Sequence, residues 1–182
     1  MKKLSLTIAI VFILVGCSHF PSSVKITVGE QEDSTSNSEL TYKDKQKEIV
    51  DFINEDMNEI ASYEKKANEA LAKVSGENFR NDKELHTVLT NEVLPEYEKA
   101  IEKAKSLEVT TDELNPIKEE ILGVLDIYYK ALLLEKEALE KNDAKLIEQS
   151  NAMVDDYLNA LSDYHKNMET LAEKYGIDYQ RE

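Results

Sequence analysis

Residues 143–175 read DAKLIEQSNAMVDDYLNALSDYHKNMETLAEKY, and this stretch has the most regular hydrophobic repeat in the chain. Its apolar residues recur at alternating steps of three and four, which is the period of a helix that buries one face. The repeat comprises Ile147, Val154, Tyr157, Leu161, Tyr164, Met168, Leu171 and Tyr175, with Ser150 as its one polar member. Asn142-Asp143 is placed to cap this helix, and Gly176 followed by Ile177 is typical of a Schellman stop.

The same spacing predicts three earlier helices. The first spans about residues 42–75 and is interrupted by one polar residue, Glu64. The second begins at Asn81, in the position of an N-cap, and contains Pro95, where we expect a kink. The third is opened by residues 110–113 and has the widest apolar surface.

Four amphipathic helices with short connections predict an all-α domain over residues 42–182, arranged as an antiparallel up-down four-helix bundle. Repeat steps that average 3.5 residues imply a slight left-handed supercoil. In this arrangement the connections at 76–80 and 142–143 lie at the end far from the chain's entry. The connection at 108–111 and the carboxyl terminus lie at the near end.

Residues 17–41 differ from the helical part, because they are polar, acidic and rich in serine. This composition predicts a flexible tether, which as a coil spans roughly 25–30 Å. The run VKITV at residues 24–28 alternates like a strand. The sequence offers no second strand to pair with it, so we interpret the run as extended linker.

The first sixteen residues have the pattern of a secretory signal peptide. Lys2 and Lys3 precede a largely apolar run over residues 4–15, and Gly16 supplies the small residue before the cut. The apolar run is too short to span a bilayer, which needs about 20 residues. Residues 1–16 are therefore expected to be removed.

The tetrapeptide Leu14-Val15-Gly16-Cys17 resembles the lipobox of bacterial lipoproteins, and Cys17 is the single cysteine of the chain. The resemblance implies that Leu14, Val15 and Gly16 are recognised during processing and that the Cys17 thiol receives a diacylglycerol. It further implies an extracytoplasmic protein, lipid-anchored to the cell membrane. The Lys- and Glu-rich remainder, which lacks tryptophan, is similar in composition to small helical envelope lipoproteins of Gram-positive bacteria.

Charge and composition exclude several classes of function. Removing residues 1–16 takes away two lysines and no acid, so the net charge of −15 becomes −17. Such a surface repels nucleic acid and favours cationic ligands or basic partners. Acylation of Cys17 would leave no thiol for disulfides, metals or catalysis.

Metal and catalytic motifs are also missing from the sequence. None of His19, His86 and His165 follows a Glu by three positions, as the di-iron sites of helical bundles require. Five scattered glycines form no phosphate-binding loop. We therefore expect no metal, no cofactor, no catalytic residues and no enzyme activity.

Two stretches of the helices are candidate binding surfaces. Asp51, Glu55 and Glu59 recur every four residues on the first helix. They form either a strip that binds a basic partner or cations, or a solvated face, and we favour the solvated face. On the third helix a second apolar line beside the main stripe comprises Leu122, Leu125, Tyr129 and Leu133. This line predicts either burial between two neighbouring helices, which we favour, or a groove for a partner helix or apolar ligand.

Two further features remain candidates. Phe79 and Arg80, in the distal connection, are residue types that anchor interfaces, although a Phe before a helix cap commonly packs onto the first turn. Tyr157 and Tyr164, together with Glu135, would line a pocket if the bundle enclosed one.

These patterns lead to one functional hypothesis and one alternative. We expect a non-catalytic, membrane-anchored protein, attached through diacylglyceryl-Cys17, that binds a protein or a cell-wall partner. The alternative is a lipoprotein receptor for a small ligand or cation, with its pocket inside the bundle.

A Cys17→Ala variant tests the lipobox. Without the thiol no diacylglycerol can be attached, so we expect the variant to leave the membrane fraction and to incorporate no labelled palmitate. Wild-type protein labelled in the same cells is the control. Palmitate incorporation by the variant would contradict the assignment.

Overall fold

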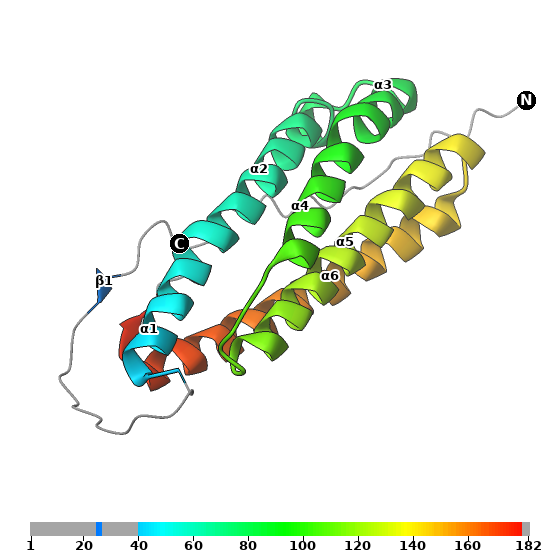
Figure 1. The fold of residues 1–182 in the computed structure, drawn as a ribbon. Coiled ribbons are helices and arrows are strands. Elements are labelled where there is room, and N and C mark those ends of the chain that lie inside the picture. The colour runs from blue at the N-terminus through cyan, green and yellow to red at the C-terminus, as the bar shows by residue number, and fades with distance from the viewer. Residues whose placement is uncertain (1–24, 27–39, 180–182) are drawn as a thin grey trace, which may run out of the picture.

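The computed structural model describes residues 25–26 and 40–179 of the 182-residue chain. The predicted signal peptide, the lipobox-like tetrapeptide and most of the predicted tether lie outside the described residues. The described part is almost entirely helical, which confirms the all-α prediction (Figure 1). Its helices are α1 (Tyr42–Asp51), η1 (Phe52–Met57), α2 (Asn58–Ala72), η2 (Gly76–Asn78), α3 (Asp82–Val88), η3 (Leu89–Val93), α4 (Leu94–Ser106), α5 (Leu114–Lys141) and α6 (Ala144–Lys174).

The first helical rod consists of α1, the π-helical η1 and α2, without a break from Tyr42 to Ala72. It starts in a capping box, in which the Asp44 amide donates to the Thr41 hydroxyl at 3.2 Å and the Thr41 amide donates to the Asp44 carboxylate at 3.1 Å. The reciprocal bonds satisfy two groups that a helix start leaves without partners. The rod ends slightly earlier than residue 75, the boundary predicted from sequence.

The second rod consists of α3, η3 and α4. Asn81 caps it as predicted, because its side-chain oxygen accepts from the Glu84 amide at 2.9 Å. The irregularity expected at Pro95 takes the form of the π-helical turn η3, which ends two residues earlier at Val93. A proline lacks an amide donor and crowds the preceding turn, and a widened turn accommodates both effects.

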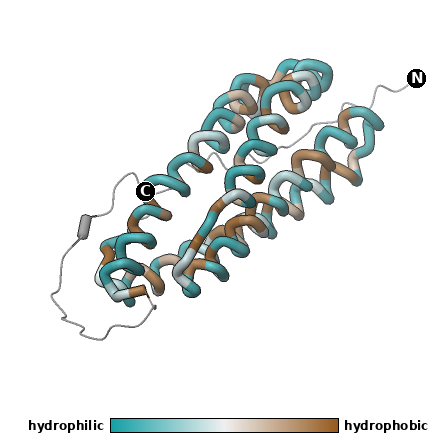
Figure 2. The backbone as a smooth tube through the Cα atoms, viewed as in Figure 1, coloured by the Kyte–Doolittle hydropathy of each residue, from teal (hydrophilic) through white to brown (hydrophobic). Residues whose placement is uncertain are grey.

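The third and fourth rods are α5 and α6. The rods pack in chain order, with α2 against α4, α4 against α5, and α5 along α6 (Figure 1). Figure 2 shows hydrophobic and hydrophilic residues interspersed along every helix, as amphipathic packing requires. Each rod contributes fully buried side chains to one shared core, among them Ile49, Ile60, Leu85, Leu89, Ile121, Leu125 and Met168. The described helices include none that is both long enough and apolar enough to cross a membrane.

Two connections confirm their predicted chemistry. Asn142 takes a left-handed conformation at the end of α5 (φ 52°), and the Asp143 carboxylate then accepts from the Lys145 amide at 2.9 Å to cap α6. At the end of α6, Gly176 has φ 63° and donates its amide to the Glu173 carbonyl at 3.0 Å. A residue with a side chain would be strained in this turn.

One expectation about the tether is wrong. The sequence predicts no pairing partner for residues 24–28, yet β1 (Lys25–Ile26) pairs antiparallel with β2 (Ile177–Asp178). The partner strand is a two-residue extension directly after Gly176, too short to give a strand pattern in the sequence. The interpretation as unpaired linker therefore fails at residues 25–26.

Candidate functional site

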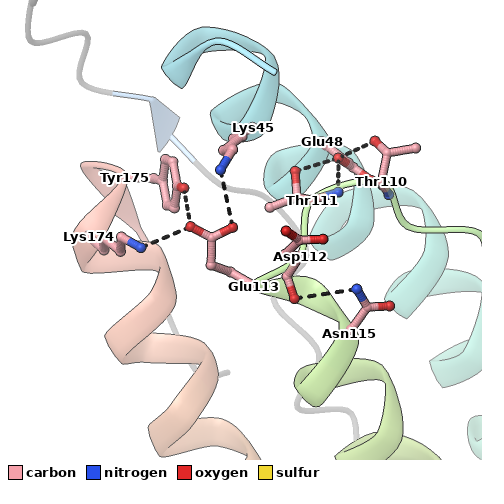
Figure 3. A network of polar contacts seen from close by, with 9 residues as sticks. All are labelled: Lys45, Glu48, Thr110, Thr111, Asp112, Glu113, Asn115, Lys174 and Tyr175. Atoms are coloured by element: carbon pink, nitrogen blue, oxygen red, sulfur yellow. Dashed lines mark hydrogen bonds and ion pairs between the residues drawn. The ribbon is translucent and has the colours of Figure 1, made fainter. Parts of the chain in front are cut away.

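The polar contacts at one end of the molecule join three segments far apart in sequence. The Glu48 carboxylate on α1 accepts four hydrogen bonds from the connection before α5 (Figure 3). The donors are the amides and hydroxyls of Thr110 and Thr111, the Thr111 amide at 2.9 Å and its hydroxyl at 2.5 Å. Burial opposes ionisation of Glu48, but these bonds outweigh it and lower its pKa.

Glu113 joins the same connection to both ends of the helical part. Its carboxylate accepts from Lys174 at 2.9 Å, from the Tyr175 hydroxyl at 2.8 Å and from Lys45 at 3.5 Å (Figure 3). The bonds from Lys174 and Tyr175 lower the pKa of Glu113 to about 2. Burial and the contact with Glu113 raise the pKa of Tyr175 to about 12.

We call residues 45, 48, 110, 111, 113, 174 and 175 the basal network. Both of its carboxylates are already occupied by donors from the protein itself. The arrangement therefore fastens the start of α1, the connection at 107–113 and the end of α6 together. This grouping agrees with the prediction that these segments share one end.

A second polar group lies inside the helical core. Glu64 of α2 is only 4% exposed, and its carboxylate accepts a hydrogen bond from the Tyr97 hydroxyl of α4 at 3.3 Å. The Tyr97 ring contacts Tyr128 of α5 (centroids 5.0 Å apart), and Tyr128 contacts Tyr157 of α6 (4.6 Å). Tyr164, also of α6 and fully buried, lies within electrostatic range of Glu64.

We call Glu64, Tyr97, Tyr128, Tyr157 and Tyr164 the interior cluster. Burial raises the pKa of Glu64 to about 7, and the Tyr97 hydrogen bond offsets only part of this effect. No cation contributes to the pKa of Glu64 within the described part of the chain. The cluster is therefore a place where a proton or a small cation would relieve an unfavourable buried charge.

Glu135 of α5 has a related environment. Its side chain is half-buried, but its Oε1 atom is closed to solvent and has no hydrogen-bond partner in the structure. Burial raises the pKa of Glu135 to about 7. The sequence grouped Glu135 with Tyr157 and Tyr164; in the structure Tyr157 contacts Tyr128, and Tyr164 lies within electrostatic range of Glu64.

Lysines form ion pairs with most of the acidic side chains in the strip of the first rod. Lys47 contacts Asp51 at 2.5 Å, and Lys103 of α4 lies 2.9 Å from both Glu59 and Asp56. Glu55 is exposed. The lysine from α4 gives this strip a structural role in holding two rods together, beside any role in docking.

The second apolar line of α5 is buried to very different degrees. Leu125 is fully buried, Leu122 and Tyr129 are half-buried, and Leu133 is 40% exposed. The Tyr129 hydroxyl donates to Glu98 of α4 at 2.6 Å, and this bond and burial raise the pKa of Tyr129 to about 12. The line therefore begins between helices and ends on the surface.

The remaining candidates lie in the connection after α2 and among the histidines. Phe79 is half-buried against the core, and Arg80 is exposed, with its guanidinium 3.7 Å from Glu84. His86 contacts Glu140 at 3.0 Å, and the His165 ring contacts the Tyr179 hydroxyl at 2.7 Å. In the residues that the structure describes, no three metal-binding side chains cluster closely enough to hold an ion.

Comparisons with protein-family models, with curated proteins and with solved structures find no match to this chain. The candidate sites are therefore argued from their own geometry. The sequence missed Tyr97 and Tyr128 as partners in the interior cluster, and it marked Glu64 only as an interruption of an apolar stripe. A buried polar position in an otherwise regular repeat was the one signal that pointed there.

Glu64→Gln tests the cost of the buried carboxyl. Because its folded pKa lies above the ordinary value of 4.5, Glu64 supports folding fully below pH 4.5, and this support is lost as the pH rises to about 7. The neutral amide avoids this loss. We expect the free energy of unfolding of the variant to exceed that of wild type at pH 8 by on the order of 3 kcal/mol, with little difference at pH 4.

Urea unfolding at the two pH values measures this difference. Glu69→Gln, at an exposed position of the same helix, is the matched control and should change stability little at either pH. A Glu64→Gln effect of equal size at pH 4 and pH 8 would contradict the argument.

Glu48→Gln tests the basal network. The NH₂ group of glutamine is a hydrogen-bond donor and cannot accept the bonds that Thr110 and Thr111 donate to the carboxylate. We therefore expect the substitution to lower the free energy of unfolding at pH 7 by about 1–3 kcal/mol. Because the folded pKa of Glu48 is lowered, its contribution is present above the ordinary pKa and lost as the pH falls through the folded pKa. The loss in the variant should therefore shrink on acidification.

Thermal and urea unfolding between pH 2 and pH 7 provide the measurement, with Glu55→Gln on the same rod as the control. A stability loss at Glu55 as large as that at Glu48 would show that the network has no special role.

Proposed function

We propose that this chain is a lipid-anchored, extracytoplasmic helical protein that binds a protein or cell-envelope partner and catalyses no reaction. In this proposal residues 1–16 are the signal peptide, Cys17 carries the lipid, and residues 42–182 form an antiparallel up-down four-helix bundle. The single cysteine at the end of a lipobox-like tetrapeptide supports the anchor.

The observation that carries the binding role is the exposure of Leu133. Among the described residues only Leu40, Tyr42 and Leu133 are large apolar side chains exposed by more than a third. Leu133 continues the line of Leu122 and Tyr129 along one face of α5. Tyr129 follows Leu122 by seven positions and Leu133 follows Leu122 by eleven, and both spacings return to the same face of a helix. An apolar line that runs out onto a charged surface is a natural contact for a partner.

The partner's charge follows from the protein's own. A strongly acidic protein favours a basic partner surface, whereas an anionic wall polymer would bind only with cations as bridges. A protein partner is therefore the better fit. Phe79 and Arg80, in the connection after α2, offer a second contact region.

Cross-linking in living cells tests this role. A photoreactive residue at Leu133 should capture a defined partner, and the same residue at Asn151, an exposed position on α6, should not. Leu133→Asp should abolish capture from a probe at Tyr129 while the helical circular dichroism stays unchanged. Identical products from positions 133 and 151, or none from 133, would contradict the proposal.

The interior cluster favours one alternative, a receptor for a small cation. A buried carboxyl beside tyrosine side chains combines the two groups, a negative charge and aromatic rings, that attract ammonium ions. Tetramethylammonium and calcium chloride are suitable probes in a thermal-shift titration. Stabilisation that is present in wild type and absent in Glu64→Gln would support this alternative, and no shift in wild type would reject it for both probes.

A further inference from the structure

The ladder between β1 and β2 connects the predicted tether to the basal end of the helical part. Lys25 is paired with Asp178 and Ile26 with Ile177, in antiparallel register. β2 follows α6 directly, three residues after Lys174. The neighbouring Tyr175 stacks on Tyr42 at the start of α1, with ring centroids 5.1 Å apart.

The β2 edge is held in place from both sides. Gly176 turns the chain out of α6, and the Ile177 side chain is only 3% exposed and belongs to the core. After β2, the Tyr179 hydroxyl contacts the His165 ring of α6 at 2.7 Å. A short extended segment fixed in this way presents backbone groups that need a hydrogen-bonding partner.

We propose that β2 is a docking edge for residues 25–26. Their pairing forms a releasable strap that holds the basal end of the helical part, which is the end with the basal network, close to the lipid anchor. The membrane part of this inference rests on the proposed lipidation of Cys17. The strap itself is a property of the polypeptide and can be tested without the lipid.

The strap changes how far the helices can stand from the membrane. Cys17 and Lys25 are eight positions apart, so β1 lies at most about 29 Å from the anchored residue. With the strap released, the 25 positions between Cys17 and Tyr42 allow about 80–90 Å. The strap also selects the basal end as the one that faces the membrane.

Release requires little energy, because a ladder of two residue pairs is weak on its own. Docking of the strap therefore holds the carboxyl end of α6 close to the membrane. Because α6 has 31 residues and is about 46 Å long, release of the strap lets its other end stand farther from the membrane. The same domain can thus meet partners at two heights without any change in its core.

Disulfide trapping in soluble protein tests the strap. In a Cys17→Ser background, Lys25→Cys with Asp178→Cys places two thiols at paired positions, where antiparallel neighbours have Cα atoms about 4.5–5.5 Å apart. We expect rapid disulfide formation under mild oxidation. The pair Ser34→Cys with Asp178→Cys is the control and should react at least tenfold more slowly; equal rates would overturn the strap.

A backbone variant gives a second, independent measurement. Proline at both positions 25 and 26 removes the amide donors of β1, whereas alanine at both keeps them. Hydrogen exchange at the Ile177 and Asp178 amides should accelerate in the proline variant and not in the alanine variant. Unchanged exchange in both variants would overturn the pairing.

The lipidated protein then tests the effect on height. A fluorophore at Asp112→Cys, an exposed basal position, should transfer energy to acceptor lipids in phosphatidylglycerol–phosphatidylcholine vesicles more efficiently in the alanine variant than in the proline variant. Equal transfer would overturn the role of the strap in seating the domain. Failure of the protein to sediment with vesicles would instead contradict lipidation, and the soluble disulfide result would still decide whether the strap exists.

Discussion

The structure depends on the need of α5 to bury apolar side chains on two sides. Its main stripe is joined by Leu125, which is fully buried, so one neighbouring helix cannot cover it. The contacts of α5 with both α4 and α6 meet this need. They also place Tyr128 between Tyr97 and Tyr157, so that the burial of α5 assembles the ring contacts of the interior cluster.

The carboxylates of the basal network and the interior cluster differ because of the donors around them. Glu48 and Glu113 are partly buried but are surrounded by amides, hydroxyls and lysines, and their pKa values are lowered. Glu64 accepts a 3.3 Å bond from the Tyr97 hydroxyl, the Glu135 Oε1 atom has no hydrogen-bond partner among the described residues, and burial raises both pKa values to about 7. The basal network therefore keeps its carboxylates charged to low pH, whereas Glu64 in the helical interior takes up a proton near neutral pH.

Local features of the sequence predicted local features of the structure well. Asn81 and Asp143 cap helices and Gly176 ends one, because each of these effects acts within one or two helical turns. The particular side-chain contacts between distant helices could not be predicted. Lys103 pairs with two acids of the first rod, and nothing in the spacing of either helix indicates which helices become neighbours.

The sequence by itself determined the helical class, the helix starts and stops, and the acidic character of the surface, since periodicity, capping and charge are properties of short segments. The tertiary structure decided that Glu64 lies against Tyr97, that the second apolar line of α5 is buried at Leu125 and exposed at Leu133, and that residues 25–26 pair with the end of α6. These outcomes depend on how whole helices dock, and a two-residue strand becomes defined only when the folded core holds its partner in place.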